Sequence, residues 1–203
     1  MRVLDLADPV CMLLLENLNM QSTALVSPVL VEILPRRKQI LVIGFGRDHC
    51  PETAYETAYK VGSEVARRGA LLLTGGLGGV MEAASRGAKD GGGFVIGIIP
   101  HDDKGQANDF CDAVVATGIG FARDFITAYS ADAIIVVGGG AGTMIEIAAA
   151  YQKKIPIVAV KGTGGMADRL VDTYVDDRKI EKVFGDSNPE KAVALAFSII
   201  GTG

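Results

Sequence analysis

Residues 39–76 read QILVIGFGRDHCPETAYETAYKVGSEVARRGALLLTGG, and this stretch decides the fold class. The nearly continuous apolar runs Gln39–Ile43 and Ala70–Leu73 are typical of parallel strands that are covered on both faces. Between them, Glu52–Arg68 carries apolar residues at i, i+4, i+7 and i+11, which form one stripe of a helix: Ala54, Ala58, Val61 and Val65. Gly69 follows as a helix stop. The stretch therefore predicts a strand, a crossover helix and a second, parallel strand.

The same alternation of strand and helix patterns continues along the chain. Four further apolar runs predict strands at Phe94–Ile99, Ala113–Ala116, Ala133–Val137 and Ile155–Val160. Segments with helical spacing separate these runs. This alternation predicts the α/β class, with an open parallel sheet covered by helices on both faces.

Residues 1–37 have a different pattern and are expected to form an N-terminal extension to a domain of residues 38–203. The apolar runs Val10–Leu15 and Val29–Leu34 are separated by the break at Ser27-Pro28. We interpret them as a short helix and a possible edge strand. An arm that contacts another subunit, or a partly disordered arm, is the alternative interpretation.

Composition excludes several classes of protein. The 203 residues are 49% hydrophobic and 22% charged, with 20 basic and 24 acidic residues and a net charge of −4, which fits a globular protein and disfavours nucleic-acid binding. The apolar runs are too short to span a membrane, and the acidic N-terminal stretch disfavours a secretory signal. Three widely spaced cysteines predict reduced thiols and a cytoplasmic location. With two histidines and no CxxC pair, we expect no metal site.

Glycines follow three of the expected strands, at the sheet edge where open α/β folds bind ligands. Backbone amides near glycine can approach an anion closely, and a following helix adds the positive end of its dipole. We therefore predict a phosphate or ligand site formed by Gly44, Gly46, Gly75, Gly76, Gly78, Gly79, Gly139, Gly140, Gly142 and Thr143. The alternative is that each glycine only permits a tight turn.

Two common phosphate motifs are absent from the sequence. No GxxxxGK[ST] segment is present, which disfavours a P-loop NTPase. In the first turn His49 occupies the place of the third glycine of a dinucleotide fingerprint, and the second strand ends at Thr74 without an acid for a ribose hydroxyl. An NAD enzyme is therefore disfavoured.

The motifs that remain resemble the LOG (LONELY GUY) superfamily, many members of which were misnamed "possible lysine decarboxylases". They are the segments 74–82 (TGGLGGVME) and 139–146 (GGAGTMIE), together with Arg123. The segments 117–123 (TGIGFAR) and 161–165 (KGTGG) are most similar to the branch that contains the molybdenum cofactor carrier protein. The resemblance implies a Rossmann-like, nucleotide-binding domain and a homodimer or dimer of dimers. It also implies a phosphorylated small-molecule ligand, with no required cofactor.

LOG enzymes hydrolyse the N-glycosidic bond of nucleoside 5′-monophosphates, and the resemblance implies Arg123 and Glu146 as catalytic residues. The sequence departs from the hydrolase motifs at four positions: Gly138, Ala141, Ile145 and Asp124. Asp124 stands where hydrolase members have lysine and brings a negative charge near the expected anion site. The resemblance thus implies a nucleoside 5′-monophosphate phosphoribohydrolase, or alternatively a non-catalytic carrier or sensor of a phosphorylated cofactor such as the molybdenum cofactor.

Several of these side chains also have simpler interpretations. Thr143 and Glu146 have the spacing of a capping box, which alone would explain the glutamate. Asn108 lies in the polar loop 101–112, which we interpret as a lid over the site. Tyr129 and Tyr151, like the nearby Phe125, are expected in the core or a subunit interface.

Overall fold

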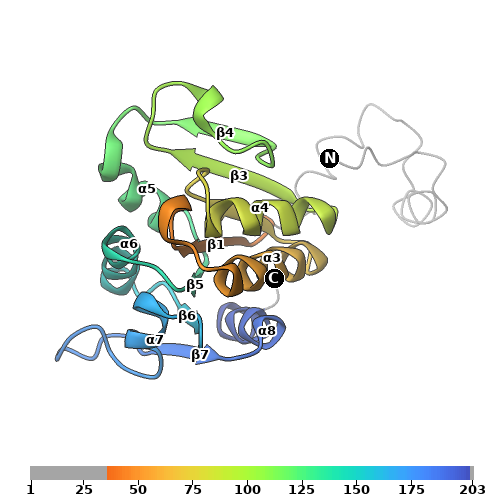
Figure 1. Ribbon diagram of the computed structural model, residues 1–203. Helices are drawn as coiled ribbons and strands as arrows, with labels where there is room; N and C mark the ends of the chain where they lie inside the picture. The colour runs from red at the N-terminus through yellow and green to blue at the C-terminus, as the bar shows by residue number, and fades with distance from the viewer. Residues whose placement is uncertain (1–35, 202–203) are drawn as a thin grey trace, which may run out of the picture. The chain divides into compact units, whose positions relative to one another are not determined.

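The computed structural model describes residues 36–201, and within them lies a seven-stranded parallel sheet with the strand order β4-β3-β2-β1-β5-β6-β7 (Figure 1). The strands are β1 Gln39–Gly44, β2 Leu71–Thr74, β3 Phe94–Ile99, β4 Ala113–Ala116, β5 Ala133–Val137, β6 Ile157–Val160 and β7 Val183–Asp186. Each neighbouring pair is parallel, so the carboxyl ends of all seven strands lie at one edge of the sheet.

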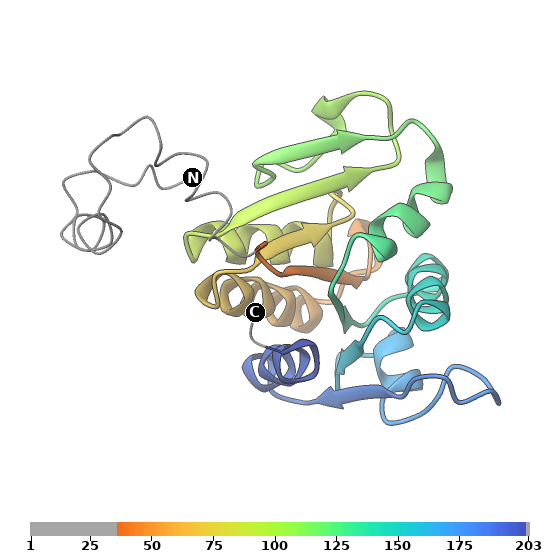
Figure 2. The ribbon, with the colours of Figure 1, turned by 180° about the vertical axis from the view of Figure 1, so that it is seen from behind.

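Helices cover both faces of this sheet, as seen from front and back in Figures 1 and 2. The α-helices are α3 Glu52–Arg67, α4 Val80–Asp90, α5 Arg123–Tyr129, α6 Ala141–Gln152, α7 Gly165–Leu170 and α8 Pro189–Ile200, and the short 3₁₀ helices are η1 Arg47–His49, η2 Lys104–Gln106 and η3 Gly120–Ala122. Helices α3, α4 and α8 pack with one face of the sheet, and α5, α6 and α7 with the other. The predicted fold class, a Rossmann-like α/β fold, is confirmed.

The central strands divide their side chains between two hydrophobic cores. In β1, Ile40 and Val42 join the core beneath α3, α4 and α8, whereas Leu41 and Ile43 join the core on the opposite face. All four side chains are buried. This double burial explains why the strand has no polar alternation in sequence.

All six predicted strands are present, and their ends shift by at most two residues. The crossover helix is also present, and its predicted apolar stripe is buried. Strand β7 was missed because its sequence VFGD is short and ends in glycine and aspartate, which strands usually avoid. Its pairing with β6, for example Val183 with Ile157, is a tertiary contact that no local pattern indicates. The interpretation of residues 1–37 falls almost entirely outside the described residues.

The strand order changes direction between β1 and β5, which are neighbours in the sheet. After β1 the chain runs to α3 on one face, and after β5 it runs to α6 on the other. The two connections separate at this point, which is where doubly wound sheets form a ligand crevice.

Candidate functional site

A cavity of about 460 Å³ lies at the carboxyl ends of β1 and β2, between η3, α5 and the start of α6. It brings together eight of the predicted site residues: Gly44, Gly46, Gly75, Arg123, Gly140, Gly142, Thr143 and Glu146. These residues come from four separate segments, so the convergence is a product of the fold. The remaining lining residues were not predicted to bind ligand: Ile43, Phe45, His49, Leu77, Met81, Phe121 and Asp124.

Four of the predicted glycines lie elsewhere. Gly78 lines an adjoining cavity, whereas Gly76, Gly79 and Gly139 line neither cavity. The Gly76 N–H donates to the Thr74 hydroxyl at 3.1 Å and is therefore already paired. At Gly79 the φ angle is +71°, and a β-carbon would lie 2.5 Å from the Phe45 carbonyl oxygen. The positive φ angle and this close contact mean that the turn itself requires glycine at position 79.

The start of α6 presents backbone donors to the cavity. The N–H of Met144 donates to the Gly140 carbonyl at 3.1 Å, so the amides of residues 141–143 precede the first bonded turn of the helix. Gly140, Gly142 and Thr143 line the cavity at this helix end. Such a helix end attracts an anion because its free amides and the helix dipole both favour negative charge.

Thr143 and Glu146 do not form a capping box. The N-cap of α6 is Gly140, and no side chain caps it. The Thr143 hydroxyl instead donates to the Gly44 carbonyl at 3.0 Å, which ties α6 to the end of β1. Glu146 is only 7% exposed and is paired with Arg123. The capping interpretation of Glu146 is therefore wrong.

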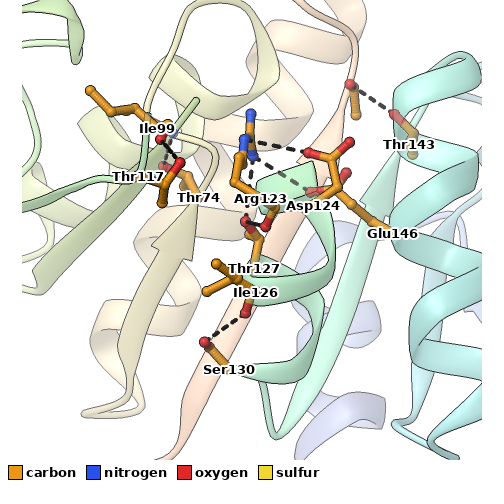
Figure 3. A network of polar contacts seen from close by, with 12 residues as sticks. Thr74, Ile99, Thr117, Arg123, Asp124, Ile126, Thr127, Ser130, Thr143 and Glu146 are labelled. Atoms are coloured by element: carbon orange, nitrogen blue, oxygen red, sulfur yellow. Dashed lines mark hydrogen bonds and ion pairs between the residues drawn. The ribbon is translucent and has the colours of Figure 1, made fainter. Parts of the chain in front are cut away.

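Three charged side chains are buried together in the cavity wall (Figure 3). Arg123 Nη1 lies 3.9 Å from Glu146 Oε1, and Arg123 Nε lies 3.4 Å from Asp124 Oδ1. The Nε–H makes no hydrogen bond with any described residue. A β-carbon on Gly75 would lie 2.6 Å from Arg123 Nη1. The absence of a side chain at Gly75 therefore leaves room for the guanidinium. One cation thus faces two carboxylates.

Burial controls the protonation of the two acids. Burial is the largest cause and acts together with the negative charge of Asp124 to raise the pKa of Glu146 to about 8, against the opposing attraction of Arg123. Burial also raises the pKa of Asp124, against the attraction of Arg123. At neutral pH Glu146 therefore holds a proton in most molecules, so its oxygens can both donate and accept hydrogen bonds.

The two cysteines within residues 36–201 are not activated as nucleophiles. Burial raises the pKa of the Cys111 thiol to about 11 and also raises that of Cys50, so neither thiol is activated.

Within residues 36–201 no group of three or more His, Cys, Asp or Glu side chains could hold a metal ion. None of the described helices is long and apolar enough to cross a membrane.

The model of the SLOG cluster4 family matches residues 37–193. The chain belongs to this family. This SLOG cluster4 protein is 30% identical, over 154 residues, to a cytokinin riboside 5′-monophosphate phosphoribohydrolase of Mycobacterium tuberculosis. The match covers 68% of this chain and 82% of that enzyme.

Solved structures of molybdenum cofactor proteins have the same fold as this SLOG cluster4 protein. The molybdenum cofactor binding protein of Rippkaea orientalis aligns with a TM-score of 0.70 and 34% identity, over 83% of this chain and 100% of that chain. The molybdenum cofactor carrier protein of Chlamydomonas reinhardtii aligns with a TM-score of 0.71 and 33% identity, over 82% and 100%. The resemblance to the LOG superfamily and to its carrier-like branch is therefore confirmed.

The cavity-lining residues that were not predicted from sequence had only weak sequence signals. Phe45, Leu77 and Met81 lie within or just after the glycine-rich turns, so their position in sequence was a usable indication. Asp124 stood out only as a departure from the hydrolase motif. Its place in the cavity depends on the packing of α5, which the sequence does not specify.

Proposed function

We propose that this SLOG cluster4 protein binds a phosphorylated, nucleotide-type ligand in the cavity, with the phosphate at the start of α6. The observation that carries the proposal is the convergence of this helix end with the buried Arg123–Glu146 pair in one cavity. The buried Nε–H of Arg123 supports it, because this donor makes no hydrogen bond with any residue of 36–201 and such a donor is the kind of group that a ligand satisfies.

We further propose that the bound ligand is a nucleoside 5′-monophosphate and that the protein hydrolyses its N-glycosidic bond. In this reaction water adds to the anomeric carbon, the bond to the base nitrogen breaks, and the base leaves with a proton from the water. The transition state carries positive charge on the sugar, which Glu146 stabilises in the fraction of molecules where it is ionised. This carboxylate accepts one proton of the water and passes it to the base nitrogen, so that Glu146 ends the reaction ionised as it began. Arg123 holds the Glu146 carboxylate and offers a permanent positive charge to the ligand.

Carriage of a phosphorylated cofactor without catalysis is the second candidate function, and Asp124 favours it. A second buried carboxylate beside Arg123 weakens the positive field that would bind the departing base. The two molybdenum cofactor proteins that share the fold support this candidate, with a cofactor of that kind as the bound ligand.

Adenosine 5′-monophosphate (AMP) and other nucleoside monophosphates test both candidates. We expect binding in calorimetry, slow release of free base in chromatography, and a loss of release of at least 100-fold in Glu146→Gln with binding retained. Glu190→Gln, an exposed acid in the first turn of α8, is the matched control and should behave like the wild type. Binding without release in the wild type would overturn hydrolysis and favour carriage. Failure of every monophosphate to bind would overturn nucleotide binding.

We also propose a cytoplasmic location and a homo-oligomeric state. The described cysteines, Cys50 and Cys111, are free thiols, as expected in a reducing compartment. Exposed apolar side chains on α5 support self-association. We expect neither nucleic acid nor membrane as a partner, given the net charge of −4 and the short apolar runs.

A further inference from the structure

A second cavity, of about 420 Å³, adjoins the first. The two share Gly46, Leu77 and Met81 as lining residues, and the far wall of the second is formed by His101 and residues 106–108. The loop interpreted from sequence as a lid therefore forms the wall of a separate space beside the first cavity.

The wall of the second cavity is fastened to the rest of the fold. The Asn108 N–H donates to the Gly76 carbonyl at 2.8 Å, and Asn108 Nδ2 donates to the Leu77 carbonyl at 2.9 Å. Asn108 Oδ1 accepts from the Phe110 N–H at 3.1 Å, and the His101 carbonyl accepts from the Gly118 N–H at 3.0 Å. These bonds hold the loop against the turn that follows β2, so the second cavity is a built feature of the structure.

The second cavity has its own cation. Arg47 lies across Gly78, where a β-carbon would be 2.6 Å from Arg47 Nε. Arg47 Nη2 lies 3.8 Å from Glu82 Oε2, and the Arg47 side chain is 77% exposed, so the guanidinium is loosely paired and available. His101 adds a second nitrogen donor, whereas Asp48 is the one acid that lines this cavity. A guanidinium in this setting favours phosphate over neutral groups because it can donate two parallel hydrogen bonds.

We infer that the ligand of this protein is longer than a mononucleotide and is a pyrophosphate-linked dinucleotide. One nucleotide lies in the first cavity, and the other lies in the second, where Arg47 binds its phosphate. This inference rests on the proposed function of the first cavity. Each cavity has the volume of an ordinary small-molecule site, so each can hold one half of such a ligand. The three shared residues place the halves side by side, as one ligand requires.

Titration calorimetry with AMP and diadenosine diphosphate, two adenosine 5′-phosphates joined by a pyrophosphate bond, tests this inference. We expect the dinucleotide to bind wild-type protein at least tenfold more tightly than AMP. Arg47→Ala should remove this preference and leave AMP affinity within twofold of the wild type. Arg86→Ala is the matched control, because Arg86 is an exposed arginine with an equally loose pairing to Asp90, at 4.0 Å. Guanosine 5′-monophosphate and diguanosine diphosphate repeat the comparison with the other purine.

Three results would overturn the inference. Equal affinity for AMP and diadenosine diphosphate in the wild type overturns it and leaves the proposed function standing. The inference is also overturned if Arg47→Ala lowers the affinity for AMP and for diadenosine diphosphate equally, because Arg47 would then act on the first nucleotide. Failure of all the nucleotides to bind overturns both the inference and the proposed function.

Discussion

Glu146 lies in an environment that is unusual for a glutamate. It is buried beside a second carboxylate, and its pKa is raised from 4.5 to about 8. Arg123 lies near enough to attract the ionised form but does not offset the loss of hydration. The cavity thus holds a carboxyl group whose proton is released near physiological pH. Such groups are found at functional sites more often than elsewhere.

This raised pKa makes the free energy of unfolding depend on pH. Between about pH 4.5 and 8 the folded protein holds a Glu146 proton that the unfolded chain has lost, so stability falls as pH rises. Glu146→Gln removes this loss. Relative to the wild type, its free energy of unfolding should increase by about 1.4 kcal/mol for each pH unit in that interval and level off above it. Urea unfolding at pH 5, 6, 7, 8 and 9 measures the difference. Glu190→Gln should follow the wild type, and a Glu146→Gln difference that is constant with pH would contradict the prediction.

Among the elements, α3 and α4 form the tightest packing on their side of the sheet. A β-carbon on Gly62 of α3 would lie 2.0 Å from the Ala84 carbonyl oxygen, and one on Gly87 of α4 would lie 2.0 Å from the Tyr59 carbonyl oxygen. Each helix therefore places a glycine against the backbone of the other. The contact also positions the site, because α4 contributes Met81 to both cavities.

This contact reverses the usual effect of alanine in a helix. Helix propensity alone favours alanine over glycine by about 1 kcal/mol. Gly62→Ala should instead lower the free energy of unfolding by about 1–3 kcal/mol, because the methyl group forces the helices apart. Gly142→Ala is the control, since a β-carbon there meets nothing within 4 Å and should not destabilise the fold. Chemical denaturation compares the two variants, and a Gly62→Ala protein more stable than the wild type would show that the helices are not in close contact.

At the scale of the whole molecule, apolar side chains remain uncovered on and beside α5. Phe121 is 79% exposed, and Phe125, Ile126 and Tyr129 are each more than 40% exposed. The rings of Phe125 and Tyr129 are in contact, with centroids 6.2 Å apart and planes tilted by 56°. Exposed apolar groups that gather in this way usually mark a contact surface. Tyr151, in contrast, is buried and belongs to the core.

We predict that this α5 surface mediates self-association. Sedimentation velocity at micromolar concentration should show a species larger than a monomer, and Phe125→Asp should shift the protein to the monomer. Ile199→Asp, at an exposed apolar position on α8, is the matched control and should leave the association unchanged. A wild-type protein that sediments as a monomer, or a Phe125→Asp protein that still associates, would be evidence against this surface.

Local sequence patterns predict six of the seven strands, the crossover helices and the edge of the sheet at which the candidate site lies. Those features depend on contacts within a few residues, such as the apolar stripe of α3 and the glycines after β1 and β2, so local spacing predicts them. The resemblance to the LOG superfamily added Arg123 and Glu146. The packing of α5 against α6 places a nitrogen of Arg123 3.9 Å from a Glu146 oxygen, with Asp124 beside them.

Tertiary packing also determines which glycines face a cavity and places β7 as an edge strand of the sheet. It likewise makes the loop around Asn108 a wall of the second cavity. Each of these features depends on where separate segments pack against one another. The Thr143 hydroxyl is an example: it could have capped its own helix, but it donates to the Gly44 carbonyl, 99 residues away in sequence. Local spacing cannot choose between two such partners, because the choice depends on which acceptor the folded chain brings within reach.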